Sequence, residues 1–104
     1  MNELIVGNHT LHTLNSREVA EMVGKEHKNL LRDIHTYISY MKGGQLKIEP
    51  SDFFIESTYQ NEQNKTMPCF LITRKGCDHL AHKMTGQKDT LFTAMYITRF
   101  YAME

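Results

Sequence analysis

The stretch SREVAEMVGKEHKNLLRDIHTYISYM, residues 16–41, decides the fold because it holds two helix patterns on either side of one glycine. The first helix is expected to begin at Ser16 and to end at Gly24, since glycine readily adopts the left-handed conformation that closes helices. Ala20, Gly24 and Leu30 stand at the intervals that a helix-turn-helix requires. The spacing therefore predicts a helix-turn-helix.

The second helix is expected to run from about Lys25 or Glu26 to Met41, just before the pair Gly43-Gly44. On a helical wheel its apolar arc consists of Leu30, Leu31, Ile34, Tyr37, Ile38 and Met41, with His27 among them. The opposite arc consists of Lys25, Lys28, Asn29, Arg32, His35 and Thr36, and Glu26 and Asp33 fall at its border. A face that only confers solubility usually mixes both charge signs, so this separation favours a binding surface for DNA.

In a helix-turn-helix the second helix enters the major groove with its N-terminal residues nearest the bases. Asn29 has the paired donor and acceptor that suit adenine, and Arg32 or Lys28 can reach guanine. Lys25, in the expected first turn, is placed for a phosphate.

The residues flanking this helix supply further candidates. Ser16 and Arg17, at the start of the first helix, could contact phosphates. His27 has two interpretations: its position on the wheel points inward, as for a packed histidine, but it also lies where a base-reading residue would lie.

The remaining chain completes an α+β pattern. Short strands are expected at residues 4–6 and 10–12 around a Gly7-Asn8 turn, and at 52–59 and 68–72, with helices following at about 73–81 and 88–102. We therefore expect a single winged helix-turn-helix-like domain over residues 1–104, with an N-terminal β-hairpin, a central β-hairpin and C-terminal helices. The polar 60–66 loop, with Asn64 and Lys65, is either a DNA-contacting wing or an ordinary exposed hairpin tip.

Charge is segregated along a chain whose formal net charge is zero. Residues 24–47 carry net +3 and residues 48–62 carry net −4, with no Lys or Arg in the second segment. Because the distribution of charge decides where a polyanion binds, the basic segment fits duplex DNA despite the neutral total.

The sequence shows no motif of an enzyme or cofactor site, such as a nucleophile elbow or a phosphate-binding glycine loop. Cys77, His79 and His82, with Cys69 upstream, lack the spacing of a zinc site, so we expect no metal and no cofactor. Without a signal peptide or a membrane-spanning stretch, the cytoplasm is the expected location, and the cysteines are expected to be buried free thiols.

The last helix is apolar on more than one side, which predicts a protein contact. One hypothesis is a homodimer formed through Leu91, Met95 and Phe100, pairing two recognition helices for a palindromic site. The alternative is an effector that binds a different protein through this helix or through the acidic 48–62 segment.

Several blocks of the chain resemble the phage regulatory protein Rha family. They are residues 16–34 (SREVAEMVGKEHKNLLRDI), Phe54 to Tyr59, Leu71-Ile72-Thr73-Arg74-Lys75-Gly76 with Leu80, Met84-Thr85-Gly86, Tyr96-Ile97, Phe100 and Met103-Glu104. The resemblance covers about residues 14–104, and it departs from the family around Asp89 and Thr90, where alanine and a charged helix surface are expected. It implies a phage- or prophage-encoded regulator with a winged-helix-like module, similar to the N-terminal modules of phage antirepressors. With this origin, the alternative becomes a phage effector that binds a host protein on the same scaffold. Many members carry a second, C-terminal domain.

Overall fold

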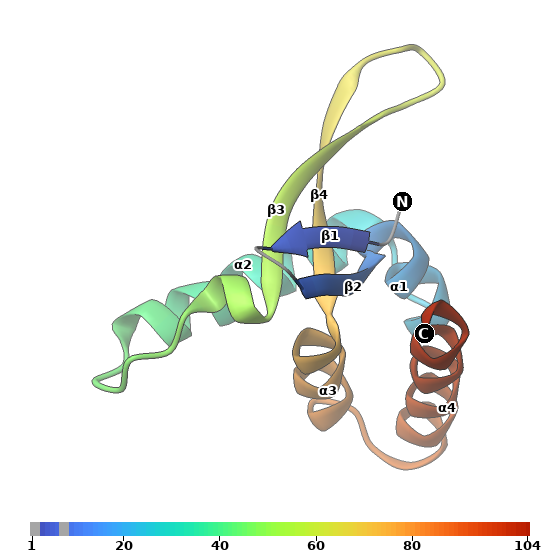
Figure 1. Cartoon of the computed structure of the whole chain (residues 1–104). Helices are drawn as coiled ribbons and strands as arrows, with labels where there is room; N and C mark the ends of the chain where they lie inside the picture. The colour runs from blue at the N-terminus through green and yellow to red at the C-terminus, as the bar shows by residue number, and fades with distance from the viewer. Residues whose placement is uncertain (1–2, 7–8) are drawn as a thin grey trace.

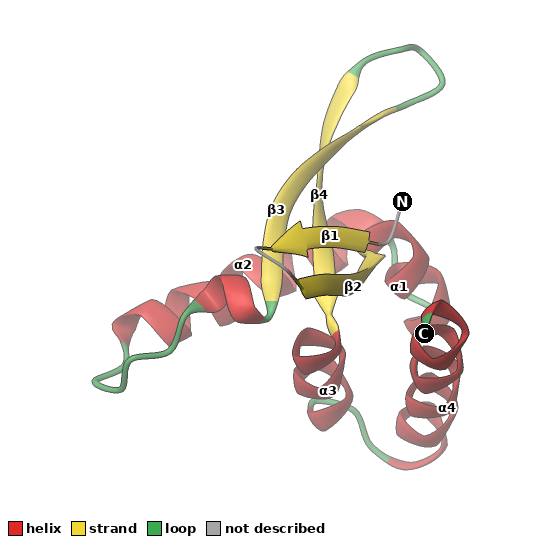
Figure 2. Ribbon diagram, in the orientation of Figure 1, coloured by secondary structure: helices red, strands yellow, loops and turns green. Residues whose placement is uncertain are grey.

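The computed structural model describes residues 3–6 and 9–104, and it is an α+β domain (Figures 1 and 2). Its elements in chain order are β1 (Glu3–Val6), β2 (His9–Asn15), α1 (Ser16–Val23), α2 (His27–Gly43), the 3-10 helix η1 (Pro50–Asp52), β3 (Phe54–Gln60), β4 (Thr66–Thr73), α3 (Arg74–His82) and α4 (Gly86–Met103). The expected N-terminal hairpin, central hairpin and C-terminal helices are confirmed, while the Gly7-Asn8 turn falls outside the described residues.

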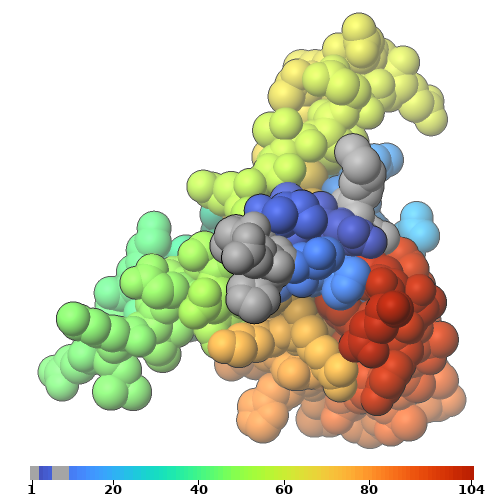
Figure 3. All heavy atoms as spheres, viewed as in Figure 1, coloured from blue at the N-terminus to red at the C-terminus, as the bar shows by residue number. Residues whose placement is uncertain are grey.

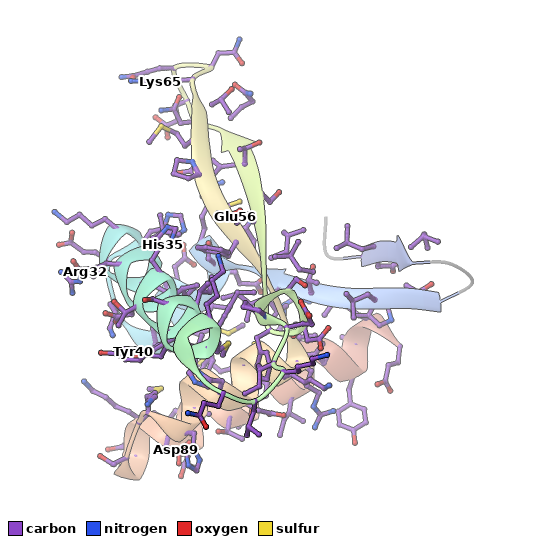
Figure 4. The ribbon with its side chains drawn as sticks, turned by 90° about the vertical axis from the view of Figure 1, so that its left-hand side faces the viewer. Arg32, His35, Tyr40, Glu56, Lys65 and Asp89 are labelled. Atoms are coloured by element: carbon purple, nitrogen blue, oxygen red, sulfur yellow. The ribbon has the colours of Figure 1, made fainter. Side chains whose placement is uncertain are left out.

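The four strands form one antiparallel sheet in the order β1-β2-β4-β3. β2 and β4 pair only from Thr13↔Thr73 to Asn15↔Leu71, so the two hairpins share a short seam. The β3–β4 hairpin projects far beyond the body, whereas α3 and α4 lie at its base (Figures 1 and 3). α2 lies on the side of the molecule opposite to the β1–β2 hairpin (Figure 4).

Two expected boundaries are wrong. The strand expected from Asp52 begins only at Phe54, because Asp52 ends the 3-10 helix η1, in which Pro50 takes the first helical position that proline favours. α2 begins at His27 after an uncapped Glu26, so Lys25 lies in the connection between the helices instead of in the first helical turn.

The α1–α2 turn has the expected glycine at its centre. Gly24 closes α1 in the left-handed conformation with φ of 69°, and the next amide, Lys25 N–H, donates to Ala20 O at 2.9 Å. Glu18 on α1 accepts two hydrogen bonds from the Arg99 guanidinium on α4, at 2.6 and 3.2 Å. Hydrogen bonds therefore fix the turn that follows α1 and attach α1 to α4.

One core joins the sheet to the helices. Its buried side chains include Phe54, Phe70 and Ile72 from the hairpin, Leu30 and Ile34 from α2, and Phe92, Tyr96 and Phe100 from α4. The α4 residues recur every four positions, so one stripe of that helix faces the core. The expectation that Phe100 forms part of an outward interface is wrong, because Phe100 is only 4% exposed.

The start of α3 depends on close backbone contact. Thr73 Oγ1 accepts from Gly76 N–H at 3.1 Å and donates to Asp52 O at 2.6 Å, which draws Gly76 against Phe53. A Cβ added at Gly76 would collide with Phe53 O and with Ile72 Cγ2.

Gly76→Ala is therefore expected to destabilise the domain by about 3 kcal/mol, since backbone has to move to admit the methyl group. Chemical denaturation monitored by circular dichroism measures this loss. Gly43→Ala is the matched control, because its added Cβ meets nothing within 4 Å and it should leave stability unchanged or slightly raised. Equal stability of the two variants would contradict the packing described.

Candidate nucleic-acid interface

The exposed side of α2 carries cationic and polar side chains at successive turns. This outer face consists of Lys28, Arg32, Thr36 and Tyr40, all of them exposed. The side chains of Lys28 and Arg32 are 79% and 70% accessible. Arg32 and Tyr40 point away from the body on the same side of the molecule (Figure 4). Leu30 and Ile34 on the inner side are buried, as the wheel predicts.

Carboxylates reach this face, which corrects the expectation of an acid-free basic surface. Lys25 Nζ lies 2.7 Å from Asp33 Oδ2, Lys28 Nζ lies 3.4 Å from Glu26 Oε2, and Arg32 Nη2 lies 3.8 Å from Asp33 Oδ1. Because Glu26 and Asp33 border the face, long cationic side chains fold back onto them. Lys28 and Arg32 nevertheless remain open to solvent.

Ser16 lies inside the domain and is wholly buried. Its Oγ accepts from Phe70 N–H at 2.9 Å and lies 2.7 Å from His27 Nε2. Among the hydrogen bonds of the described residues, Nε2 is the one acceptor for the hydroxyl proton, so we assign the Ser16 proton to a bond with Nε2 of a neutral imidazole. The expectation that Ser16 contacts phosphate is therefore wrong in this conformation: its hydroxyl joins β4, α1 and α2 at what we call the Ser16 junction, made of Ser16, His27 and Phe70.

Tyr59, in the stem of the β3–β4 hairpin, extends this junction. Its ring lies 6.0 Å from the His27 ring in an edge-on arrangement, and Arg17 Cζ lies 4.0 Å from the Tyr59 centroid. Sequence reasoning missed Tyr59, although its alternation with Ile55 and Ser57 along β3 places the three on one face of the strand. The α1–α2 pair and the hairpin are thus joined by direct side-chain contacts.

The tip of the hairpin is an ordered polar turn. Asn61 Oδ1 accepts from Gln63 N–H and Lys65 N–H at 2.9 Å each, and Asn64 has a positive φ of 60°. Asn64 and Lys65 are exposed, and Lys65 points to the same side of the molecule as Arg32 (Figure 4). The structure therefore turns Arg32 and Lys65 to one side (Figure 4), and Lys28 lies one helical turn before Arg32 on α2. Asn29 is half-buried on α2, and Lys25 is bound to Asp33.

Burial governs the protonation of His27. Desolvation lowers the pKa of His27, and the positive charge of Arg17 lowers it further. The imidazole therefore stays neutral in the folded domain to a pH below the point at which an unfolded histidine, with its pKa of about 6.5, takes up a proton. This matches the hydrogen bond assigned to Ser16.

Neither metal ligation nor a membrane span is evident in the part of the chain that the structure describes. Within residues 3–6 and 9–104, no three His, Cys, Asp or Glu side chains gather closely enough to hold a metal ion. Cys69 and Cys77 are buried free thiols, as expected, and burial raises the pKa of the Cys77 thiol. None of the described helices combines the length and apolarity that crossing a membrane requires.

The lowered pKa of His27 predicts that the free energy of unfolding falls as pH drops below about 6.5, because the unfolded chain binds the proton first. His27→Gln offers Ser16 a non-titrating acceptor, so its melting temperature should fall less than the parent's between about pH 7.5 and 5.5. A residual slope is expected from His79, whose pKa burial also lowers. A variant with the parent's full pH dependence would show that the junction does not titrate as described.

Comparison with known proteins places this arrangement in a family. The sequence profile described as Phage regulatory protein Rha matches residues 14–104. The chain is 48% identical over 91 residues to the SPbeta prophage-derived putative antirepressor protein YoqD of Bacillus subtilis (strain 168). This alignment covers 88% of this chain and 36% of the relative. It is also 29% identical over 86 residues to an uncharacterized protein of Haemophilus influenzae, and this alignment covers 83% of this chain and 48% of the relative.

The chain thus spans less than half the length of either relative. No solved structure matches it significantly. The profile covers nearly all of the described fold, from the last residues of β2 through α4. The chain belongs to the phage regulatory protein Rha family.

Proposed function

We propose that this domain is a phage regulator that binds duplex DNA, with α2 in the major groove and the β3–β4 hairpin as a wing. The observation that carries the proposal is the shared orientation of two exposed features, the outer face of α2 and the hairpin tip (Figure 4). α1 and the Gly24 turn set α2 at the molecular surface, as a recognition helix requires.

The proposed DNA contacts are of two kinds, those to bases and those to phosphates. Arg32 and Lys28 are exposed donors near the start of α2 that suit the acceptor pair of guanine, and the neighbouring Asn29 suits adenine. Lys65 at the wing tip suits a phosphate or the minor groove, as does Asn64 beside it. Lys25 becomes a phosphate contact only by leaving Asp33.

Arg17 and His27 take a supporting role in this proposal. Arg17 stacks on Tyr59 and is exposed, so its guanidinium can donate to a phosphate while the ring contact is kept. His27 is bound to Ser16 and half-buried, which favours the packed interpretation over a base contact. The two residues fix the angle between helix and wing.

A second candidate function is binding to another regulatory protein. The ion pairs at the outer face of α2 reduce its positive potential, and the relative from Bacillus subtilis is named as an antirepressor. Glu49, Asp52 and Glu56 of the acidic 48–62 segment are exposed, at η1 and in β3. Exposed carboxylates favour a basic protein partner.

Arg32→Ala is the decisive variant for the DNA proposal. On a duplex selected from a random pool, it is expected to weaken binding by about 1–3 kcal/mol and to relax preference at one base pair. Fluorescence anisotropy measures the affinity, and a panel of single-base substitutions measures the preference. Lys28→Ala should weaken binding and also reduce the dependence on salt, because one fewer counterion is released if Lys28 contacts phosphate.

Lys75→Ala is the matched control, because it removes an exposed lysine on α3, which lines a cavity with Thr10, His12 and Asp52 and not with the outer face of α2 or the hairpin tip. It should bind the selected duplex as the parent does. Equal affinity and equal base preference for the parent and Arg32→Ala would overturn the assignment of α2. Failure to retain any duplex at low salt, with capture of a phage or host repressor, would favour the second candidate.

A further inference from the structure

A cationic hollow, which we call the α4 hollow, lies where the α1–α2 turn and α2 meet the end of α3 and the start of α4. Its volume is about 310 Å³. Three exposed lysines line it: Lys25 from the turn, Lys83 after the last residue of α3, and Lys88 from the first turn of α4. Leu30 and Leu80, which also line it, are buried, so the α4 hollow combines cationic side chains with an apolar floor.

Two of the three lysines carry charge that the domain does not neutralise. Lys25 Nζ lies 2.7 Å from Asp33 Oδ2, and three lysines against this one lining carboxylate leave the α4 hollow with net charge +2. Neither Lys83 nor Lys88 forms an ion pair among residues 3–6 and 9–104. Lys83 Nζ lies 5.4 Å from the centroid of the Tyr37 ring, a contact that places the ammonium beside α2 and leaves its N–H groups able to donate.

The start of α4 adds to this positive potential. Thr85, the residue before the helix, lines the α4 hollow, and no side chain caps the first helical turn. The positive end of an 18-residue helix dipole therefore lies at the same place as Lys83 and Lys88. Lysine donors above an apolar floor suit a phosphodiester group, whose charge faces the lysines while its sugar carbons contact the floor.

The α4 hollow lies on the side of the molecule that carries the other proposed DNA contacts. Asp89, next to Lys88 at the start of α4, lies on the same side as Arg32 and Lys65, with Arg32 between the other two (Figure 4). The major groove of B-DNA is about 12 Å wide, and an α-helix with its side chains nearly fills that width. Elements on either flank of a helix in the groove therefore meet the phosphates that border it.

We propose that Lys83 and Lys88 hold a backbone phosphate of the duplex in the α4 hollow, on the flank of α2 opposite to the hairpin tip. The proposal rests on the proposed function, because it requires α2 in the major groove. It adds the start of α4 to the DNA interface, as a contact that positions the domain and carries no base preference. Lys25 keeps its bond to Asp33 in this arrangement, so the lining carboxylate is already neutralised when the phosphate binds.

A double variant of the full chain, Lys83→Ala with Lys88→Ala, tests the contact by fluorescence anisotropy on the selected duplex over a series of salt concentrations. Affinity is expected to fall by about five- to tenfold near 0.1 M salt, because one fewer phosphate is neutralised. The slope of log K against log salt concentration should become smaller by about 0.9, with base preference unchanged.

The matched control is the double variant Arg74→Ala with Lys75→Ala. It removes the same two charges from the opposite end of α3, where both side chains are exposed and line a different cavity. It should bind the selected duplex with the parent's affinity and the parent's salt slope. Melting temperatures close to that of the parent are expected for both double variants, because all four side chains are exposed.

Neutral methylphosphonate linkages, introduced one at a time into the selected duplex, locate the phosphate. One linkage at the edge of the groove should weaken binding of the parent and of the control variant. The same linkage should cost the Lys83→Ala, Lys88→Ala variant nothing further, because the lysines and that phosphate act as one pair.

The outcomes separate this proposal from the role of α2. A Lys83→Ala, Lys88→Ala variant that matches the control in affinity and salt slope, while Arg32→Ala weakens binding, would overturn the phosphate contact and leave α2 as the recognition helix. Sensitivity to every neutral linkage equal to the parent's would also overturn it, since the lysines would then act only through long-range attraction. Unchanged binding by Arg32→Ala as well would remove the proposed function itself.

Discussion

The arrangement of this domain depends on the buried hydroxyl of Ser16. Strand pairing between β2 and β4 stops at Asn15↔Leu71, and the next amide along β4, Phe70 N–H, donates to Ser16 Oγ instead. Because a buried polar group needs partners, His27 completes the set and fixes where α2 begins. The position of α2 relative to the sheet therefore depends on the two hydrogen bonds that join Ser16 Oγ to Phe70 N–H and to His27 Nε2.

In the proposed function, this constraint lets a chain of zero net charge present a site for a polyanion. Exposed ion pairs contribute little to stability, so Lys28 and Arg32 can exchange Glu26 and Asp33 for phosphates or bases at small cost. Specific orientation comes from the scaffold, in which Arg17, Tyr59 and His27 couple the helix to the hairpin. The carboxylates lower non-specific attraction and leave shape and hydrogen bonding to select the site.

Sequence periodicity predicted the elements well, because Gly24, the apolar arc of α2 and the alternation of β3 each reflect a local backbone rule. It could not place side chains whose partners are distant in the chain. Ser16 was predicted as a phosphate contact because its burial arises from Phe70, 54 positions away. The folding of Lys25 onto Asp33 and the inward stripe containing Phe100 likewise depend on tertiary packing that a helical wheel does not contain.

Backbone amide shifts of the isotope-labelled chain, titrated with random duplex DNA at low salt, test the central claim most directly. The account predicts that the amides of Lys28, Asn29 and Arg32 and of the hairpin tip at 61–65 shift together and return as salt is raised, since both elements face one side of the molecule. Shifts confined to α4 or to the acidic 48–62 segment, with α2 unmoved, would contradict it.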